Sequence, residues 1–175
     1  MATSTLTAAT PRVVVSRNTG ALRRVFAAGM LLGLTDISYA WLLYVIILGR
    51  TTYTRVAQSI ASGLLGRATY SGGAATAVLG LTLHFTIALI WTVFFYLLFR
   101  YWPPMRRMLQ AKRGPIYVGL AYGVIIWLVM NLVVIPLSRA TGGPLFTWIN
   151  ALSILVHAVF LGLPMVLIVG RSQPE

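Results

Sequence analysis

The stretch that decides the fold is residues 74–99, AATAVLGLTLHFTIALIWTVFFYLLF, which contains no aspartate, glutamate, lysine or arginine. Similar apolar stretches cover residues 25–49, 115–137 and 147–170. Each is longer than the ~20 residues that a helix needs to cross about 30 Å of hydrocarbon. Backbone groups in lipid must be satisfied within the segment, and apolarity without strict alternation argues against a barrel. We therefore predict an all-α protein, a four-helix transmembrane bundle.

The composition agrees with that prediction. Hydrophobic residues make up 58% of the 175-residue chain and charged residues 9%, and the mean hydropathy is +0.85. A soluble domain of this size needs more polar surface, so the apolar excess is expected to face lipid. The chain has no cysteine, which excludes disulfides and thiolate metal sites.

The basic residues predict the orientation in the membrane. By the positive-inside bias, the side with more lysine and arginine lies in the cytoplasm. Ten basic residues fall on one side of the predicted spans and four on the other. The ten are Arg12, Arg17, Arg23, Arg24, Arg100, Arg106, Arg107, Lys112, Arg113 and Arg171, and the four are Arg50, Arg55, Arg67 and Arg139.

The domain organisation follows from the spans and the charges. We expect residues 1–24 to form a basic, mobile cytoplasmic tail, residues 25–170 a single transmembrane domain, and residues 171–175 a cytoplasmic C-terminal tail. The protein is then a multi-pass protein of the cell inner membrane with both termini in the cytoplasm. Short connections make the second and third spans, and the third and fourth, antiparallel neighbours.

Two connections carry their own patterns. In residues 51–73, Val56, Ile60 and Leu64 recur at helical spacing, which predicts a short amphipathic helix at the outer interface, closed by Gly63 and Gly66. A re-entrant segment is the alternative. Residues 101–115, YWPPMRRMLQAKRGP, contain a basic cluster that we expect to contact anionic lipid head groups. Nothing there supports nucleic-acid binding.

Small residues mark the predicted packing faces of the spans. A glycine lets two helix backbones approach closely, and pairs four residues apart lie on one face of a helix. We expect close helix packing at Gly29 and Gly33 in the first span, at Gly80 in the second, and at Gly119 and Gly123 in the third.

Each predicted span also contains one strongly polar side chain near the middle of the membrane or in its outer half: Asp36, His84, Asn131 and His157. The whole chain has two acidic residues, and the other is Glu175. A lone ionised aspartate at that depth costs about 2.5–3.5 kcal/mol on insertion scales, so Asp36 is expected to meet a partner. These four residues form the predicted intramembrane polar site.

This site has several interpretations. One is a hydrogen-bonded network that only fixes the arrangement of the helices, as in a purely structural membrane component. A second is a site that handles protons or a solute, in a proton-linked carrier or an accessory subunit of a larger membrane assembly. A third is a b-type haem held between His84 and His157. A homo-oligomer or a larger complex is a further expectation.

Other chemistries have weaker support. A metal site from Asp36, His84 and His157 has low specificity, and aromatic residues such as Tyr44 and Trp91 could line a quinone or pigment pocket. We assign no catalytic residue and expect a protein that is not an enzyme. The sequence does not indicate a cofactor.

Four stretches carry a resemblance to a known group of proteins: DISYAWLLY, RVAQSIASGLLG, GLTLHFTIALIW and VMNLVVIPLSRA. With them the chain resembles a group of small, uncharacterised bacterial four-helix integral membrane proteins over most of residues 25–170. The resemblance implies the same fold and membrane location. It implies no activity, substrate or cofactor.

Overall fold

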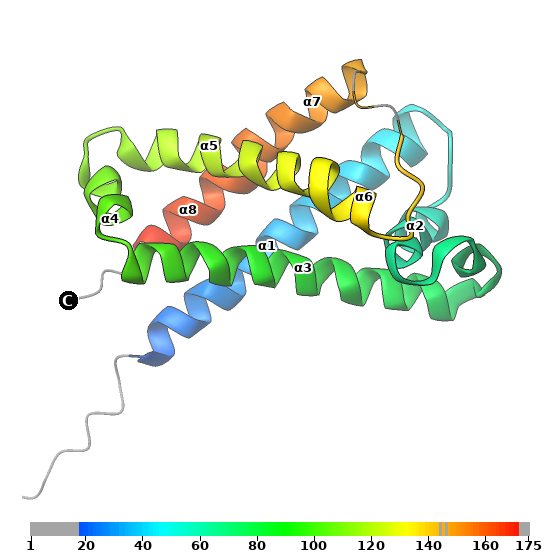
Figure 1. The fold of residues 1–175 in the computed structure, drawn as a ribbon, viewed down its shortest axis with the longest axis horizontal. Helices are drawn as coiled ribbons and strands as arrows, with labels where there is room; N and C mark the ends of the chain where they lie inside the picture. Colours follow the sequence, from blue (N-terminus) through cyan, green and yellow to red (C-terminus); the bar gives the residue numbers. More distant parts are fainter. Residues whose placement is uncertain (1–17, 144, 146, 172–175) are drawn as a thin grey trace, which may run out of the picture.

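The computed structural model describes residues 18–143, 145 and 147–171, and the regular secondary structure of this part of the chain is helical, without strands (Figure 1). Four helices are long and apolar enough to cross a membrane. They coincide with the four predicted spans to within a few residues at each end. Their bounds are Gly20–Ile47, Gly73–Tyr101, Gly114–Leu137 and Trp148–Gly170.

The spans are built from shorter helical elements, with wide π-helical turns in three of them. The first helix begins at Asn18, inside the stretch expected to be a tail, and residues 1–17 lie outside the described part. In chain order the elements are α1 (Asn18–Trp41), π-helical η1 (Leu42–Ile47), α2 (Tyr53–Leu65), 3₁₀-helical η2 (Gly66–Ser71), α3 (Gly73–Tyr101), α4 (Pro103–Gln110), α5 (Gly114–Val129), π-helical η3 (Met130–Val134), α6 (Ile135–Leu137), α7 (Trp148–Val156), π-helical η4 (His157–Gly162) and α8 (Leu163–Gly170).

Two of the π-helical turns have a cause in the sequence. Pro136 follows η3 and Pro164 follows η4. Proline has no N–H, and its ring clashes with the carbonyl four residues earlier, which here lies inside the widened turn. Widening the turn relieves that clash without breaking the span. No proline follows η1, and nothing in the structure explains its widening.

The first span packs against α3 through the two glycines predicted for it. A methyl group added at Gly29 would lie 2.6 Å from the Leu89 side chain, and one at Gly33 would lie 2.6 Å from the Phe85 ring. Ala88 is the next neighbour of Gly33. The small residues therefore bring the backbones of α1 and α3 together, as such stripes do in membrane helices.

The third and fourth spans approach even more closely. A methyl group at Gly123 would overlap the backbone carbonyl of His157, and one at Gly119 would lie 2.7 Å from the Cα of Leu163. Gly162 faces both glycines from the other side. Since all these contacts involve backbone atoms, α5 packs directly against η4 and α8 with almost no side chain between them.

The second and third spans lie antiparallel and contact each other through side chains, while their backbones approach other helices more closely. The closest backbone approaches of α3 are to α1 and α2, and those of α5 are to η4 and α8. Aromatic side chains fill the space between α3 and α5. Tyr122 donates a hydrogen bond to the carbonyl of Trp91 at 2.7 Å, and its ring centroid lies 5.0 Å from that of Phe95. In Figure 1, α1 and α8 cross obliquely behind the antiparallel α3 and α5.

The helix predicted in the connection after the first span is present as α2, but a different face of it is buried. Val56 is buried as expected, whereas Leu64 is exposed and the polar Gln58 and Ser62 are buried. The reason is Gly80: a methyl group there would overlap the carbonyl of Ala57, so the small-residue face of α2 lies against α3.

Hydrogen bonds hold α2 in that position. The Gln58 side chain donates to the Gly73 carbonyl at 3.0 Å and to the Thr76 hydroxyl at 3.1 Å, and the Thr76 hydroxyl donates to the Thr69 carbonyl at 2.7 Å. The Arg139 backbone N–H donates to the Gly63 carbonyl at 2.9 Å. The buried amide is thus satisfied, and α2 is attached both to α3 and to the connection between α6 and α7.

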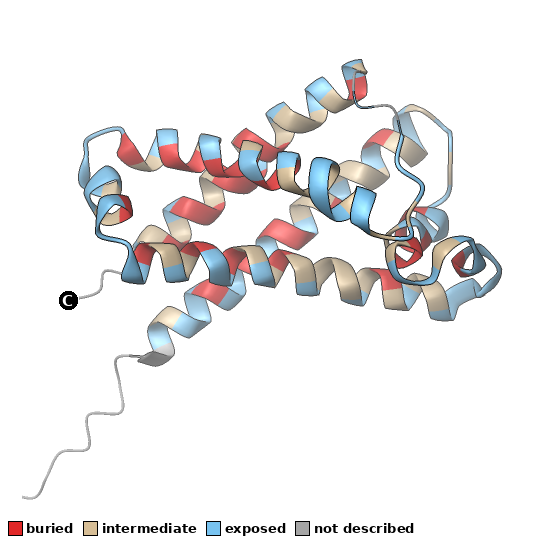
Figure 2. Cartoon of the chain, in the orientation of Figure 1, coloured by how far each residue is buried: buried red, intermediate tan, exposed pale blue. Residues whose placement is uncertain are grey.

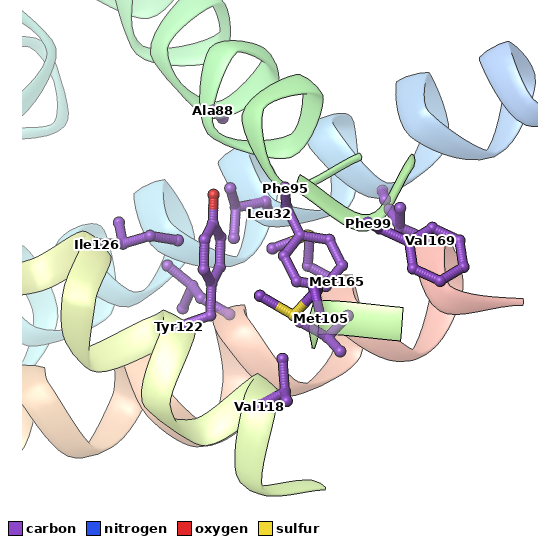
Figure 3. Packing of buried hydrophobic residues seen from close by; sticks show 13 residues of the cluster. Leu32, Ala88, Phe95, Phe99, Met105, Val118, Tyr122, Ile126, Met165 and Val169 are labelled. Carbon is purple, nitrogen blue, oxygen red and sulfur yellow. The ribbon is translucent and has the colours of Figure 1, made fainter. Parts of the chain in front are cut away.

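The hydrophobic core lies toward the end of the molecule that carries α4, which we call the α4 end (Figures 2 and 3). Phe95 and Val166 have no exposed surface, and Met165 has 1%. The opposite end, which carries α2, is the α2 end (Figure 1). Many large apolar side chains of the spans instead face outward, among them Phe26, Ile90, Phe94, Leu155 and Phe160. Such a surface suits lipid and not water.

Candidate functional site

A cavity of about 1200 Å³ occupies the α2 end and is lined by residues of all four spans, of α2 and of the connection between α6 and α7. Leu32, Ala88, Ile126 and Leu161 line it and also belong to the hydrophobic core. These side chains form the floor of the cavity and separate it from the α4 end. The other limit of the cavity is a rim of exposed residues that includes Arg50 and Arg55. We call this the polar cavity.

All four residues of the predicted polar site line this cavity: Asp36, His84, Asn131 and His157. They come from four different spans, and the fold brings them to one surface. They do not form one hydrogen-bonded network. Two of them face each other, and the other two are held by backbone carbonyls.

Asp36 and His157 form the pair. The Nε2 atom of His157 lies 3.6 Å from Oδ1 of Asp36, and the two side chains are 11% and 32% exposed. The other ring nitrogen of His157, Nδ1, lies 2.8 Å from the carbonyl oxygen of Ser153. Because a carbonyl can only accept, Nδ1 must carry a proton.

That geometry determines when the contact between the two side chains is favourable. With Nδ1 protonated, a neutral His157 presents the lone pair of Nε2 to Asp36, which an ionised carboxylate would repel. The contact is favourable when one further proton is present, either on Nε2 of His157 or on the carboxyl of Asp36. At 3.6 Å the two groups lie just beyond hydrogen-bonding distance and within the distance of an ion pair.

His84 has a different role. Its Nε2 atom lies 2.8 Å from the carbonyl oxygen of Gly33 and so donates to it. The close approach of α1 and α3 at Gly33 makes that carbonyl reachable. Its ring also packs edge-on against Phe85, with 5.5 Å between centroids. His84 thus joins the first two spans in the wall of the cavity, beside the Asp36–His157 pair.

Asn131 is attached to its own helix. Its side-chain amide donates to the carbonyl oxygen of Trp127 at 2.9 Å. Trp127 and Asn131 both belong to the third span and line the polar cavity. Asn131 contributes polar surface to the cavity and does not connect two helices.

The wide turns lie where the polar residues are. His157 is the first residue of η4, Asn131 belongs to η3, and Tyr44 of η1 lines the same cavity. π-helical turns inside longer helices occur frequently at functional sites, because they change which side chains face a given direction. The proline-linked widening therefore coincides with the polar site.

The sequence did not reveal two arginines at this site. Arg50 and Arg55 were assigned only to the less basic side of the membrane, and both lie on the rim of the polar cavity. The guanidinium of Arg55 also lies over the ring of Tyr70, at 5.6 Å from its centroid. The sequence feature that could have indicated their place at the site is their position next to the amphipathic segment.

The geometry does not favour haem or a metal. Nε2 of His84 is bonded to a backbone carbonyl and Nε2 of His157 faces a carboxyl, so neither presents that atom to a haem iron. Within the described residues, no three histidine, cysteine, aspartate or glutamate side chains lie close enough together to hold a metal ion. The considered set of Asp36, His84 and His157 is therefore not assembled as a ligand sphere.

Comparison with known proteins does not assign the chain to a family. No protein-family model, no curated protein and no solved structure matches it. What the polar cavity does must therefore be argued from its own residues. Those are the Asp36–His157 pair on one wall, His84 and Asn131 beside it, and arginines on the rim.

Proposed function

We propose that this is a multi-pass protein of the inner membrane, a four-helix bundle with both termini in the cytoplasm. Four long apolar helices with outward-facing apolar side chains support the membrane location. The orientation rests on the basic residues, most of which belong to the α4 end and the termini. In this orientation the polar cavity faces away from the cytoplasm.

We propose further that the protein binds a small solute in the polar cavity and exchanges a proton at the Asp36–His157 pair. The observation that carries this proposal is the pair itself, on the wall of a cavity large enough for a solute. Ionisable residues inside a membrane are the usual relay groups in pumps and transporters.

The charge of the pair explains how solute and proton would be coupled. With one shared proton the pair is neutral. Adding a proton makes it positive and removing one makes it negative, and either charge is costly in apolar surroundings unless an opposite charge is near. An anionic solute in the cavity therefore favours proton uptake, and a cationic solute favours proton release.

The floor of the cavity limits what one chain does alone. Leu32, Ala88, Ile126 and Leu161 separate the polar cavity from the α4 end. A carrier must also open toward that end, which requires the spans to rearrange. Four helices are few for this movement, so the proposal includes a homo-oligomer or a larger assembly in which this chain is an accessory subunit.

The test of the function uses purified protein in liposomes that contain a pH-sensitive dye. Amino acids, organic acids and amines are added one at a time, and we expect at least one to move protons faster than in protein-free liposomes. If none does so, or if the protein has a Soret band that His84→Ala and His157→Ala both remove, this function is wrong and the haem interpretation gains support.

The orientation has its own test, because the chain has no cysteine and single-cysteine variants therefore give a clean label. We expect Gln110→Cys to react with a membrane-impermeant maleimide only from the cytoplasmic side. Ser59→Cys, which lines the polar cavity, is expected to react only from the opposite side. The reverse pattern in whole cells and inverted vesicles would contradict the proposed topology.

A further inference from the structure

A second cavity, of about 530 Å³, lies at the α4 end and shares no lining residue with the polar cavity. Its lining includes Arg106, Arg107 and Gln110 of α4 and Arg171 after α8. Its apolar lining includes Phe99 of α3 together with Val166 and Leu167 of α8. We call it the basic pocket. Nothing in the proposed function uses it.

The basic pocket lacks a counter-ion within the described residues. Among the described residues the acidic side chain is that of Asp36, and it lies at the polar cavity beside His157. Arg24 approaches the pocket from α1, because its guanidinium donates to the carbonyl oxygen of Arg171 at 2.6 Å. Guanidinium groups held close together repel one another unless an anion lies among them. The described residues therefore supply no carboxylate to this pocket.

The shape of α4 keeps this arrangement in place. Pro103 stands at its first position, where a missing N–H has no cost. Met105 on one face is buried in the hydrophobic core, while Arg106 is half-buried and Arg107 is exposed. The helix is thus anchored by its apolar face and presents two adjacent arginines to the pocket.

The lining indicates what kind of anion fits. Arginine forks bind phosphate oxygens with two parallel hydrogen bonds, and the Gln110 amide can donate another. Phe99 is buried and forms the inner wall of the pocket, and the exposed Leu167 continues the pocket onto the apolar surface of the spans. A free phosphate ion would leave that apolar surface unused, whereas a phospholipid would cover it with acyl chain. Basic pockets between spans are known to receive lipid head groups.

We propose that the basic pocket is a binding site for one anionic phospholipid, with the phosphate among Arg106, Arg107 and Arg171 and the first acyl carbons against Phe99 and Leu167. This goes beyond a general attraction of basic loops to the membrane surface, because it assigns one lipid to one cavity. It is also independent of proton exchange at the polar cavity.

The test is native mass spectrometry of the detergent-purified protein titrated with phosphatidylglycerol or phosphatidylcholine. The wild type is expected to retain one phosphatidylglycerol in preference to phosphatidylcholine. The double variant Arg106→Gln/Arg107→Gln should bind phosphatidylglycerol about 25-fold more weakly, since each basic residue contributes about a factor of five near anionic lipid. The matched control is Lys112→Gln/Arg113→Gln, which removes the same charge from the same connection but not from the pocket lining.

Each outcome decides the proposal. Equal weakening in both double variants would mean diffuse attraction and would overturn the site. So would the absence of a preference for phosphatidylglycerol, or stabilisation by inorganic phosphate equal to that by the lipid. If the Arg106/Arg107 variant does not fold, Arg171→Gln compared with Arg113→Gln gives the same test: weaker binding only in Arg171→Gln supports the site, and equal binding overturns it.

Discussion

Replacing Asp36 with asparagine is expected to abolish solute-dependent proton movement in liposomes while the protein stays folded. The amide has nearly the shape of the carboxyl, and its loss of charge removes a desolvation cost, so the thermal stability should stay the same or rise. What the variant loses is the group that shares a proton with His157. The change removes the chemistry of the pair and keeps its packing.

A second readout for this prediction does not depend on knowing the solute. Trp91 and Trp127 line the same cavity, so their fluorescence should respond when the pair changes protonation. We expect a pH-dependent signal in the wild type that is absent in Asp36→Asn and present in the control Ser59→Ala, which changes another lining residue. If Asp36→Asn keeps the wild-type pH response and proton movement, Asp36 only organises the helices.

A large loss of stability is expected from Gly80→Leu. A leucine in a helix is favoured over glycine by about 1 kcal/mol, so the clash must exceed that gain to lower the stability. At Gly80 the first added carbon would overlap the carbonyl of Ala57, which belongs to the backbone of α2 and cannot turn away. We therefore expect a cost above the about 1–3 kcal/mol that is typical of overpacking, measured as a fall in the melting temperature in detergent.

Two other glycines supply the comparison. Gly33→Leu should cost less than Gly80→Leu, because its first neighbour is the Phe85 ring, which can rotate. Gly20→Leu should cost nothing, since no atom lies within 4 Å of an added methyl group there. If all three variants melted alike, or Gly80→Leu melted like the wild type, the packing of α2 on α3 described above would be wrong.

The positions of the spans could be predicted from the sequence because a helix that crosses lipid needs about 20 mainly apolar residues. The stretch from 74 to 99 meets this requirement and lies within α3. The arrangement of the helices could not be predicted in the same way. The short connection through α4 predicted that α3 and α5 are antiparallel neighbours, but not that Tyr122 and Trp91 would lie between their backbones.

The contacts of the predicted polar residues could not be derived from the sequence. Depth along each helix placed His84 and His157 near the middle of the membrane, and both line the polar cavity. The atoms that these histidines contact depend on how far each helix is rotated about its axis and on which backbone carbonyls lie nearby. Every residue has a backbone carbonyl, so the sequence does not indicate which one is contacted. His84 donates a hydrogen bond to the carbonyl of Gly33. His157 donates one to the carbonyl of Ser153, which holds its ring opposite Asp36.

The central claim is that Asp36 and His157 share one proton, and an infrared titration of the Asp36 carboxyl tests it most directly. The chain has two acidic residues, so Glu175→Gln leaves Asp36 as the sole side-chain carboxyl. If the two groups share one proton, His157→Gln should change the pH at which the protonated-carboxyl band appears. The matched control His84→Gln removes the other cavity histidine, which is bonded to a backbone carbonyl, and should leave that pH unchanged. A band that titrates identically in the wild type and in His157→Gln would contradict the account.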